Sequence, residues 1–504
     1  MADWQLGALR IRAVSPKLFI LLSAAQLIPV KTPVFHYFAM TNARKLAFTT
    51  LLAIHRGSFA DVALHNNLKH CGLSQIDRAL VTELVYGCIR RQRSLDSLIS
   101  QLANKAQKQS LELRLALHLG LYQLRYLNQI PAAAAVHTTV ELCKECALSY
   151  AARFVNALLR KYLREQTQRS EVLELPEDPL DRLGILHSYP RWILELWHNQ
   201  LASLALSEPS PPQDLERETI ADLEKLCQWF NAAPHVDLRV NPLRSSLPAV
   251  QALLAAADLE AQPIPGLPQA LRLGKTLGAI PQLPGFAEGF WMVQESSAQW
   301  VSHWLDPQPG ETIADACAAP GGKTLHLAEL MQNQGTLLAA DRTAARLKKL
   351  QENIDRLGIT CIEVHQGDSR HQPQWNDRCD RVLVDAPCSG LGTLHRHADG
   401  RWTQTPETVN GLVQIQGELL RSAASWVKPG GVLVYATCTL NPAENEIQIQ
   451  SFLADRPQWH IDRPSLSTPI ALLETTETTP GWVKVWPHHT EMDGFFIVRL
   501  RKEA

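Results

Sequence analysis

From Phe290 onward the sequence alternates short apolar runs with longer amphipathic ones, and this alternation constrains the fold more than any other feature. Apolar runs bounded by turn residues indicate strands, and apolar residues spaced three and four apart indicate helices. The predicted strands are Thr312–Ala316, Thr336–Ala340, Arg381–Val384, Val432–Ala436 and Phe495–Leu500. The predicted helices are Thr324–Met331, Ala344–Leu357 and Val413–Trp426. This order predicts an α/β sheet wrapped by helices, with ligands at the carboxyl ends of its strands.

The first predicted strand runs into a helix through the segment DACAAPGGKT, residues 315–324. Small residues and two glycines let the backbone approach a ligand closely, and the start of a helix offers free N–H groups. The segment is not a GxGxxG loop. It is not a GxxxxGK[ST] phosphate loop either, because that pattern needs glycine at Cys317. The sequence therefore favours a ligand other than a nucleoside triphosphate at this junction.

Two acidic residues follow the next two strands at the same predicted edge. Asp341 ends the second strand, 19 residues after Gly322, where a carboxylate can accept hydrogen bonds from ribose hydroxyls. Asp368 follows the expected third strand and could meet an adenine edge. Together with the glycine segment, they indicate a nucleoside-containing cofactor. The spacing alone does not separate a nicotinamide dinucleotide from S-adenosylmethionine.

Two cysteines lie just beyond predicted parallel strands, on the same edge as the glycine segment. Cys388 belongs to DAPCSGLG at 385–392, and Cys438 belongs to ATCTLNPAEN at 436–445. Structural cysteines are usually buried inside strands or helices. A pair of cysteines placed at strand ends therefore favours thiol chemistry.

The N-terminal third is basic, which the net charge of −1 for the whole chain conceals. Residues 40–165 carry 17 Lys and Arg against eight Asp and Glu, whereas residues 166–504 carry 28 against 41. Apolar residues in 42–164 recur at helical spacing with few Gly or Pro, which predicts a helical bundle. The positive clusters are Arg90, Arg91, Arg93 and Arg160, Lys161, Arg164. A basic helical domain is typical of nucleic-acid contact and equally of an ordinary solvated face.

The middle of the chain indicates a small α+β module. The polar stretch 166–180 has the composition of a linker, and a helix is expected over Tyr189–Leu206. Val236–Val240 is a predicted strand and Leu247–Ala257 a predicted helix, and a Pro-rich run of turns and short strands follows.

The first 39 residues are expected to be an extension from a start codon assigned too far upstream, with Met40 as the functional start. The apolar run Leu18–Val30 resembles a signal peptide but is too short to span a bilayer. Ten irregularly spaced cysteines favour reduced thiols in the cytoplasm, and the lone CxxC pair Cys143 and Cys146 has no partner pair that would indicate a metal. We expect neither a metal nor a membrane association.

The four motifs DACAAPGGKT, DAPCSG, ATCTLNPAEN and DGFF (493–496) together resemble the Sun/RsmB family of RNA 5-methylcytosine methyltransferases. Residues 42–165 are similar to its NusB-like domain. HSYPRW (187–192), LRVN (238–241) and Gln294–Glu295 are similar to its connecting segment. The resemblance implies an all-α NusB-like RNA-binding domain (40–165), a linker and small α+β connecting domain (166–285) and a C-terminal α/β Rossmann-like class I methyltransferase domain (286–504).

The resemblance implies transfer of a methyl group from S-adenosylmethionine to C5 of a cytosine in 16S rRNA. Cys438 is then the nucleophile and Cys388 assists release of the product, with Asp385 at the base edge. The reverse assignment stays open, because Pro-Cys is the nucleophile motif of DNA cytosine methyltransferases. The cofactor residues implied are Cys317, Ala318, Ala319, Pro320, Gly321, Gly322, Lys323, Asp341, Asp368 and Asp385.

The sequence departs from the family pattern in two places. Thr439 replaces the usual serine after the nucleophile, and His395 and Ala398 replace common Arg and Pro residues in a segment where Arg396 and Trp402 are candidates for RNA contact. The expected substrate is 16S rRNA before or early in small-subunit assembly, bound by a monomer. The alternatives are a tRNA cytosine methyltransferase and a non-catalytic RNA-binding factor. The two cysteines argue against the second alternative.

Overall fold

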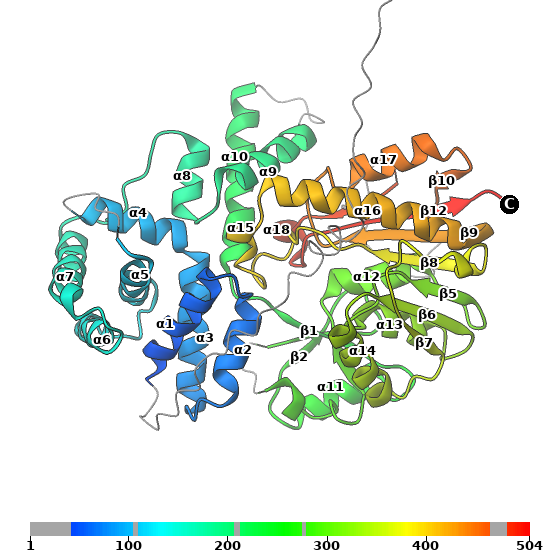
Figure 1. The fold of residues 1–504 in the computed structure, drawn as a ribbon, viewed down its shortest axis with the longest axis horizontal. Helices are drawn as coiled ribbons and strands as arrows, with labels where there is room; N and C mark the ends of the chain where they lie inside the picture. Colours follow the sequence, from blue (N-terminus) through cyan, green and yellow to red (C-terminus); the bar gives the residue numbers. More distant parts are fainter. Residues whose placement is uncertain (1–41, 104–108, 206–211, 275–278, 464–480) are drawn as a thin grey trace, which may run out of the picture. The chain divides into compact units, whose positions relative to one another are not determined.

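The computed structural model describes residues 42–103, 109–205, 212–274, 279–463 and 481–504. The expectations for the start codon and for the apolar run Leu18–Val30 lie outside these residues. Residues 43–504 form one compact unit, drawn as a ribbon in Figure 1. Among the described helices, none has the length and apolar character needed to cross a bilayer.

The N-terminal part of this unit is helical, as the apolar spacing predicts. Its helices are α1 (Ala43–His55), α2 (Ala60–Lys69), α3 (Gln75–Arg90), α4 (Gln92–Leu102), α5 (Leu111–Tyr126), α6 (Ala132–Glu145) and α7 (Ala152–Gln168). Ser74 and Ser110 cap α3 and α5 by accepting hydrogen bonds from the backbone N–H three residues on. Helix α5 is buried along most of its length, so it forms the centre around which the other helices pack.

The stretch 166–180, expected to be a linker, packs against this helical bundle. Helix α7 continues to Gln168, and Val172 and Leu173 are buried in the same core as α5 and α7. Composition suggested a linker because most of the stretch is polar, but Val172 and Leu173 anchor it, and Leu175 packs against the same core. Three further helices follow, α8 (Pro179–Leu186), α9 (Arg191–Ala205) and α10 (Pro212–Asn231).

The α+β module forms a four-stranded antiparallel sheet in the order β2-β3-β1-β4. Its elements are β1 (Val236–Val240), α11 (Leu247–Ala255), β2 (Ala261–Pro263), β3 (Ala270–Leu273) and β4 (Trp291–Val293). Strand β1 is as predicted, and it lies between β3 and β4 with all but its first residue buried. The central strand therefore brings residues of the LRVN motif into the interior.

The C-terminal part is an eight-stranded sheet in the order β10-β12-β9-β8-β5-β6-β7, with β11 paired to β12. Its strands are β5 (Thr312–Asp315), β6 (Thr336–Asp341), β7 (Ile362–Gln366), β8 (Cys379–Asp385), β9 (Val427–Thr437), β10 (Trp459–Ile461), β11 (Val483–Val485) and β12 (Phe495–Lys502). Strands β5 to β9 pair in parallel, whereas β12 pairs antiparallel to β9. All five strands predicted from sequence are present.

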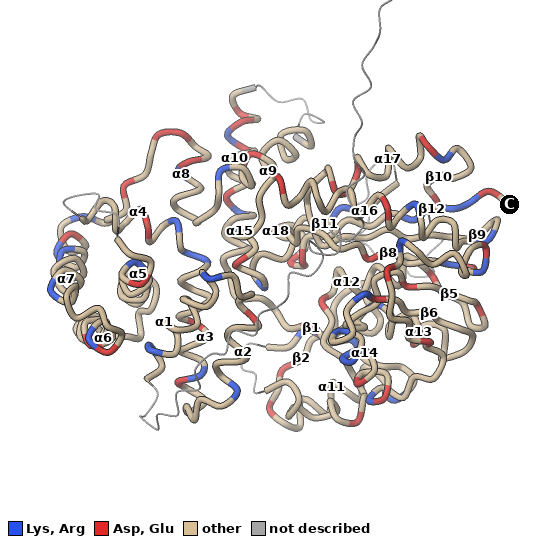
Figure 2. The backbone as a smooth tube through the Cα atoms, viewed as in Figure 1, with Lys and Arg blue, Asp and Glu red and all other residues tan. Residues whose placement is uncertain are grey.

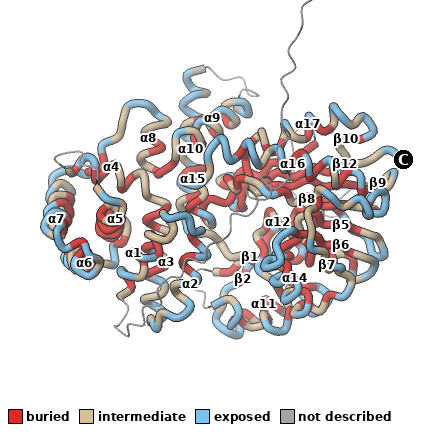
Figure 3. The backbone as a smooth tube through the Cα atoms, in the orientation of Figure 1, coloured by how far each residue is buried: buried red, intermediate tan, exposed pale blue. Residues whose placement is uncertain are grey.

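Helices cover both faces of this sheet. They are α12 (Ser296–Leu305), α13 (Gly322–Leu330) and α14 (Ala344–Leu357) on one face, and α16 (Pro406–Trp426) and α17 (Glu446–Asp455) on the other. Successive strand residues alternate between the two cores, as Val434 and Tyr435 do. Strands β5, β6, β8, β9 and β12 are accordingly buried along most of their length (Figure 3), whereas β7 at the edge of the sheet has no buried residue.

The segment that follows β8 connects the sheet to the helical bundle through α15 (Gly400–Thr403). The indole Nε1 of Trp402 donates to the Ile89 carbonyl at 2.9 Å, and the Arg90 guanidinium donates to the His395 carbonyl at 2.9 Å. Arg93 likewise donates to the Tyr189 carbonyl. Arg90 and Arg93 of the basic cluster therefore connect the helical bundle to other segments of the protein. Further Lys and Arg residues lie along α7 and α14 (Figure 2).

Candidate active site

The two cysteines predicted at strand ends are in contact. Strands β8 and β9 run in parallel with Asp385 opposite Ala436, so the loops that follow them leave the same edge of the sheet. We call residues 385–392 the first thiol loop and residues 436–445 the second thiol loop. The sulfur atoms of Cys388 and Cys438 lie 3.4 Å apart, and both side chains are partly exposed. This edge therefore offers two adjacent thiols to one ligand.

The environment keeps Cys388 in its thiol form. Its hydrogen bond with Cys438 and its burial raise the pKa of Cys388 well above the usual value, and the charge of Glu444 adds to the rise. A protonated Cys388 can donate its S–H to the neighbouring sulfur. The pair is thus suited to holding one negative charge, with Cys388 as the protonated partner.

A buried ammonium lies at the same edge. Lys323 Nζ donates to Asp385 Oδ2 at 2.8 Å and stands 5.0 Å from the centre of the Phe495 ring. Burial lowers the pKa of Lys323, but the charges of Asp385 and Cys438 outweigh this and raise it overall. The Lys323 ammonium therefore interacts electrostatically with both Asp385 and Cys438. The predicted site residues Lys323, Asp385 and Cys438 are therefore brought together.

The glycine segment forms a turn anchored by the last residue of β5. Asp315 accepts hydrogen bonds from Cys317 N at 3.1 Å and from the Thr324 hydroxyl at 2.8 Å. Gly321 has φ +112°, a conformation that favours glycine, and a side chain there would meet Leu350. Beside Gly322 the nearest atom to an added Cβ would be 3.8 Å away. The start of α13 is therefore not tightly packed on this side, which is compatible with close approach of a cofactor to the backbone.

Three acidic side chains at this edge, Asp315, Asp341 and Asp368, have different surroundings. Burial raises the pKa of Asp315 to about 7, with the charge of Asp385 adding to the effect. Asp341 ends β6, accepts a hydrogen bond from Thr343 N and forms an ion pair with Arg346 at 3.0 Å. Asp368 follows β7, and the hydrogen bonds from Arg370 lower its pKa to about 2. Asp341 and Asp368 are thus held by neighbouring arginines beyond the ends of adjacent strands.

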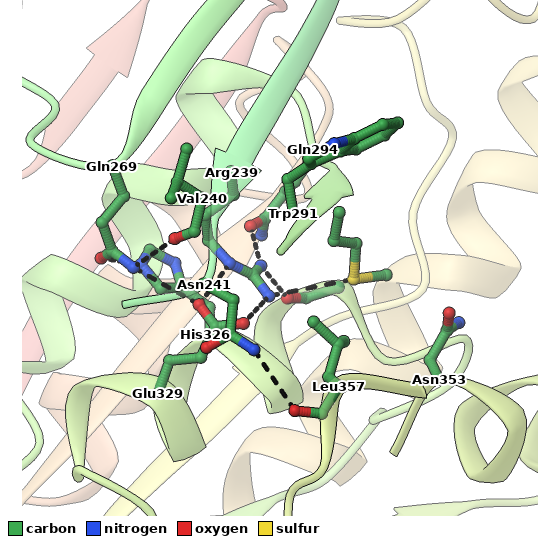
Figure 4. A network of polar contacts seen from close by, with 12 residues as sticks. Arg239, Val240, Asn241, Gln269, Trp291, Gln294, His326, Glu329, Asn353 and Leu357 are labelled. Carbon is green, nitrogen blue, oxygen red and sulfur yellow. Dashed lines mark hydrogen bonds and ion pairs between the residues drawn. The ribbon is translucent and has the colours of Figure 1, made fainter. Parts of the chain in front are cut away.

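The glycine turn is supported from behind by an arginine that belongs to the four-stranded sheet. Arg239 is fully buried and donates to both carboxylate oxygens of Glu329 on α13, each at 2.8 Å. Its remaining nitrogen donates to the Gly322 carbonyl at 2.6 Å and also to Gln294 Oε1 (Figure 4). The pair joins two sheets through the backbone of the turn. In the sequence, Arg239 and Gln294 stood out only as members of motifs, and no role was predicted for either.

A second buried carboxylate, also missed, belongs to the second thiol loop and contacts the first. Glu444 Oε1 accepts from Ser389 N at 2.8 Å and from Gln416 Nε2 at 3.0 Å. Its Oε2 accepts from the hydroxyls of Ser389 at 2.5 Å and Thr439 at 3.3 Å. The signal was present in the sequence, since Glu444 stands in the ATCTLNPAEN motif. Two of its partners, Ser389 and Gln416, lie 55 and 28 residues away and could not be inferred from the motif.

The two residues considered for RNA contact have protein partners. Arg396 donates to both carboxylate oxygens of Asp493, the nearer at 2.8 Å, and to the His235 carbonyl. Trp402 packs against the helical bundle. His395 lies 3.1 Å from Asp493, and burial lowers its pKa to about 2, so it is neutral. These contacts make the segment a structural connection and give no support to the expectation of RNA contact through Arg396 and Trp402.

Comparison with known families finds three matches along the chain. Residues 302–501 match the family described as 16S rRNA methyltransferase RsmB/F. Residues 41–164 match the NusB family, and residues 215–279 match the ferredoxin-like domain of RsmF/B-like methyltransferases. The predicted all-α NusB-like, α+β and α/β architecture is confirmed.

Individual relatives match over nearly the whole chain. A probable ribosomal RNA small subunit methyltransferase B of Synechocystis is 47% identical over 92% of this chain and 100% of its own length. A probable ribosomal RNA small subunit methyltransferase B of Bacillus subtilis is 34% identical over 92% of this chain and 99% of its own length. The solved structure of the protein PH0851 is 26% identical, with a TM-score of 0.72 over 92% of this chain and 99% of that one.

Proposed function

The chain belongs to the RsmB/F family of 16S rRNA methyltransferases, which use S-adenosylmethionine, and from this premise we propose that it methylates C5 of a cytosine in 16S rRNA through a covalent Cys438 adduct. The observation that carries the proposal is the contact of the two thiols at 3.4 Å beside the partly buried ion pair of Lys323 and Asp385. A methyltransferase that acts on a nucleophilic nitrogen or oxygen needs neither thiol.

The chemistry of cytosine explains why a thiol is needed. C5 is a poor nucleophile, so the Cys438 thiolate first adds to C6 and makes C5 electron-rich. S-adenosylmethionine supplies an electrophilic methyl group, which C5 attacks. Loss of the proton from C5 and departure of the Cys438 thiolate then restore the C5–C6 double bond. The base leaves methylated, S-adenosylhomocysteine is the leaving group of the methyl transfer, the C5 proton passes to solvent, and Cys438 is again a thiolate.

The other residues of the edge support these steps. Lys323 stabilises negative charge on Cys438, and Asp385 meets the base edge near N3 and N4. Cys388, held as a thiol, assists release of the enzyme from the methylated product. The glycine turn would hold the cofactor through its backbone, with Asp341 at the ribose, Asp368 at the adenine and Asp385 near the methionyl end. The proposal places all these groups along the carboxyl edge of β5 to β9.

The substrate must present an unstacked base, because the thiol has to reach C6. We propose that this base belongs to 16S rRNA before or early in assembly, and that the basic helical domain helps to bind the RNA. Bisulfite sequencing of 16S rRNA and tRNA from a deletion strain tests the substrate. Unchanged methylation of 16S rRNA would refute it.

Replacing Cys388 tests the mechanism. With Cys388→Ala, the adduct forms but is released slowly, so a covalent protein–RNA species should accumulate and migrate slowly on a denaturing gel. The species should disappear in the double variant that also carries Cys438→Ala. A species that requires Cys388 and forms without Cys438 would reverse the two assignments.

A further inference from the structure

The two thiol loops are joined on one side by backbone hydrogen bonds and on the other by side chains. Ala386 N donates to the Ala436 carbonyl at 2.9 Å, and Gly392 N donates to the Cys438 carbonyl at 3.0 Å. On the other side Glu444, with no exposed surface, connects Ser389 and Thr439, the residues that directly follow Cys388 and Cys438. The hydroxyls of Ser389 and Thr439 also lie within hydrogen-bond distance of each other, at 2.8 Å. The contact between the sulfurs thus depends on how these two neighbours are held.

The geometry points to Glu444 as the positioning residue that holds Cys388 and Cys438 in contact, a role that rests on the proposed two-thiol mechanism. Its four donors come from the first thiol loop, the second thiol loop and Gln416 on α16. A carboxylate accepts through both oxygens and donates nothing, which suits a point where four donors converge. Removing it would leave these buried donors without a partner and release the two loops from each other.

Helix α16 fixes this arrangement to the sheet. Gln416 Nε2 donates to Glu444 and also to the Pro387 carbonyl at 2.9 Å, next to Cys388. The backbone of Glu444 is held as well, because Tyr435 on β9 donates its hydroxyl to the Glu444 carbonyl at 2.7 Å. Glu444 is therefore anchored on the same strand whose end carries Cys438. Its position relative to both thiols follows from rigid elements.

Glu444 can act on the thiols through its hydrogen bonds and through its negative charge, and two substitutions distinguish these contributions. In Glu444→Gln, the amide oxygen can still accept from Ser389 N and Gln416, while the amide nitrogen donates to the two hydroxyls, which rotate to accept. The contacts stay and the charge is lost. In Glu444→Ala, both contacts and charge are lost. Glu446→Gln is the matched control, since Glu446 lies two residues on and pairs with Lys484 at 2.7 Å.

The experiment measures thiol proximity without RNA. Diamide closes a disulfide between adjacent thiols, as two S–H bonds break, the S–S bond forms and the N=N bond of diamide is reduced to a hydrazine. The rate at which the peptides containing Cys388 and Cys438 become joined is followed by mass spectrometry. We expect Glu444→Ala to slow closure about tenfold or more, because thiol exchange depends on access between the two sulfurs.

The two remaining variants should behave differently. Glu444→Gln and Glu446→Gln should close within about threefold of the unmodified chain when compared at equal thiolate fraction. In Glu444→Gln the pH dependence of closure should move to lower pH, since a negative charge that raises the pKa of Cys388 is removed. Methyl transfer by Glu444→Ala should fall about 100-fold in kcat, with KM for the cofactor little changed, because a misplaced reactive group affects the chemical step.

A folded Glu444→Ala chain that closes the disulfide at the unmodified rate would overturn the proposal. If Glu444→Ala does not fold, the pair Ser389→Ala and Thr439→Val removes two of the four contacts and should slow closure in the same direction; closure at the unmodified rate would again overturn it. Because closure requires neither RNA nor cofactor, its outcome is independent of whether cytosine C5 is the methylated atom.

Discussion

Two buried glutamates stand behind the two halves of the site, and they are satisfied in different ways. Glu329, behind the glycine turn, pairs with the Arg239 guanidinium through two hydrogen bonds. Glu444, on the second thiol loop, accepts from four neutral donors of Ser389, Thr439 and Gln416. A charge pair cancels its own field, whereas neutral donors leave a net negative charge beside the sulfurs. In the cofactor half, which is the glycine turn with Asp341 and Asp368, the buried pair fixes the backbone of the turn. In the thiol half, which is the two thiol loops, Glu444 also affects the pKa of Cys388.

The largest effect on methyl transfer is expected in the thiol half, at Cys438, the proposed nucleophile. If Cys438 is the nucleophile, as we propose, Cys438→Ala should lower methyl transfer at least about 10⁴-fold, because the covalent step is lost. Binding of S-adenosylmethionine, measured by calorimetry, should stay within about twofold, because the change removes one sulfur from the thiol half alone. Substantial methyl transfer by this variant would contradict the assignment. A large loss of cofactor affinity would instead show that the two halves are not separate.

Arg239→Met should have the largest effect on the cofactor half. It leaves the Glu329 carboxylate buried without its cation, and breaking such a pair costs about 3–5 kcal/mol of unfolding free energy. The Gly322 carbonyl also loses a donor, so cofactor affinity should fall while kcat at saturating cofactor changes little. Denaturant unfolding and calorimetry measure the two quantities.

The control for Arg239→Met is the double variant that also carries Glu329→Gln. Removing both charges should recover much of the lost stability, since the unpaired buried carboxylate is gone. If the double variant is as unstable as the single one, packing of the arginine and not its charge holds the turn.

Much of the fold followed from the sequence because it depends on local patterns. Strand β1 and helix α14 have the predicted ends, and the predicted edge of β8 and β9 carries both cysteines. Strands β10 and β11 were missed because each has only three residues and is defined by pairing with β12. A pattern within one segment gives no information about such a partner.

The site was predicted as a set of residues and not as a network. Resemblance supplied the motif containing Arg239, but its partner Glu329 lies 90 residues away and carries no motif. The same limit applies to Glu444. What the sequence could not give is which buried donor meets which acceptor, because that depends on how the two sheets and the helices pack.

A smaller effect is expected from pH, again on the cofactor half. Burial raises the pKa of Asp315 to about 7 in the folded chain, above the ordinary value of about 4 expected when unfolded. The folded state then binds the extra proton between these values, so this carboxyl's contribution to stability falls as pH rises from about 4 through 7. Between pH 5 and 8 the loss is about 2.5 kcal/mol.

Asp315→Asn tests that contribution. An asparagine can still accept from Cys317 N and can donate to the Thr324 hydroxyl, so the turn should be kept while the titration is lost. The decline in unfolding free energy between pH 5 and 8 should be about 2.5 kcal/mol shallower in the variant. An unchanged pH profile would show that Asp315 is already ionised in the folded chain and would weaken the contrast between the two halves.

The smallest effect is expected from Thr439→Ser, which restores the residue usual in the family. Thr439 contributes to the thiol half through its hydroxyl, which contacts Ser389 and Glu444, and serine supplies the same group. We expect methyl transfer to change less than about twofold and unfolding free energy to fall by about 1 kcal/mol for the lost buried methyl. Thr439→Val is the converse control, since it keeps the shape and removes the hydroxyl. It should slow methyl transfer more than Thr439→Ser while leaving cofactor affinity intact. Equal rates for the two variants would mean that the hydroxyl is dispensable and that neutral donors around Glu444 do not govern the thiols.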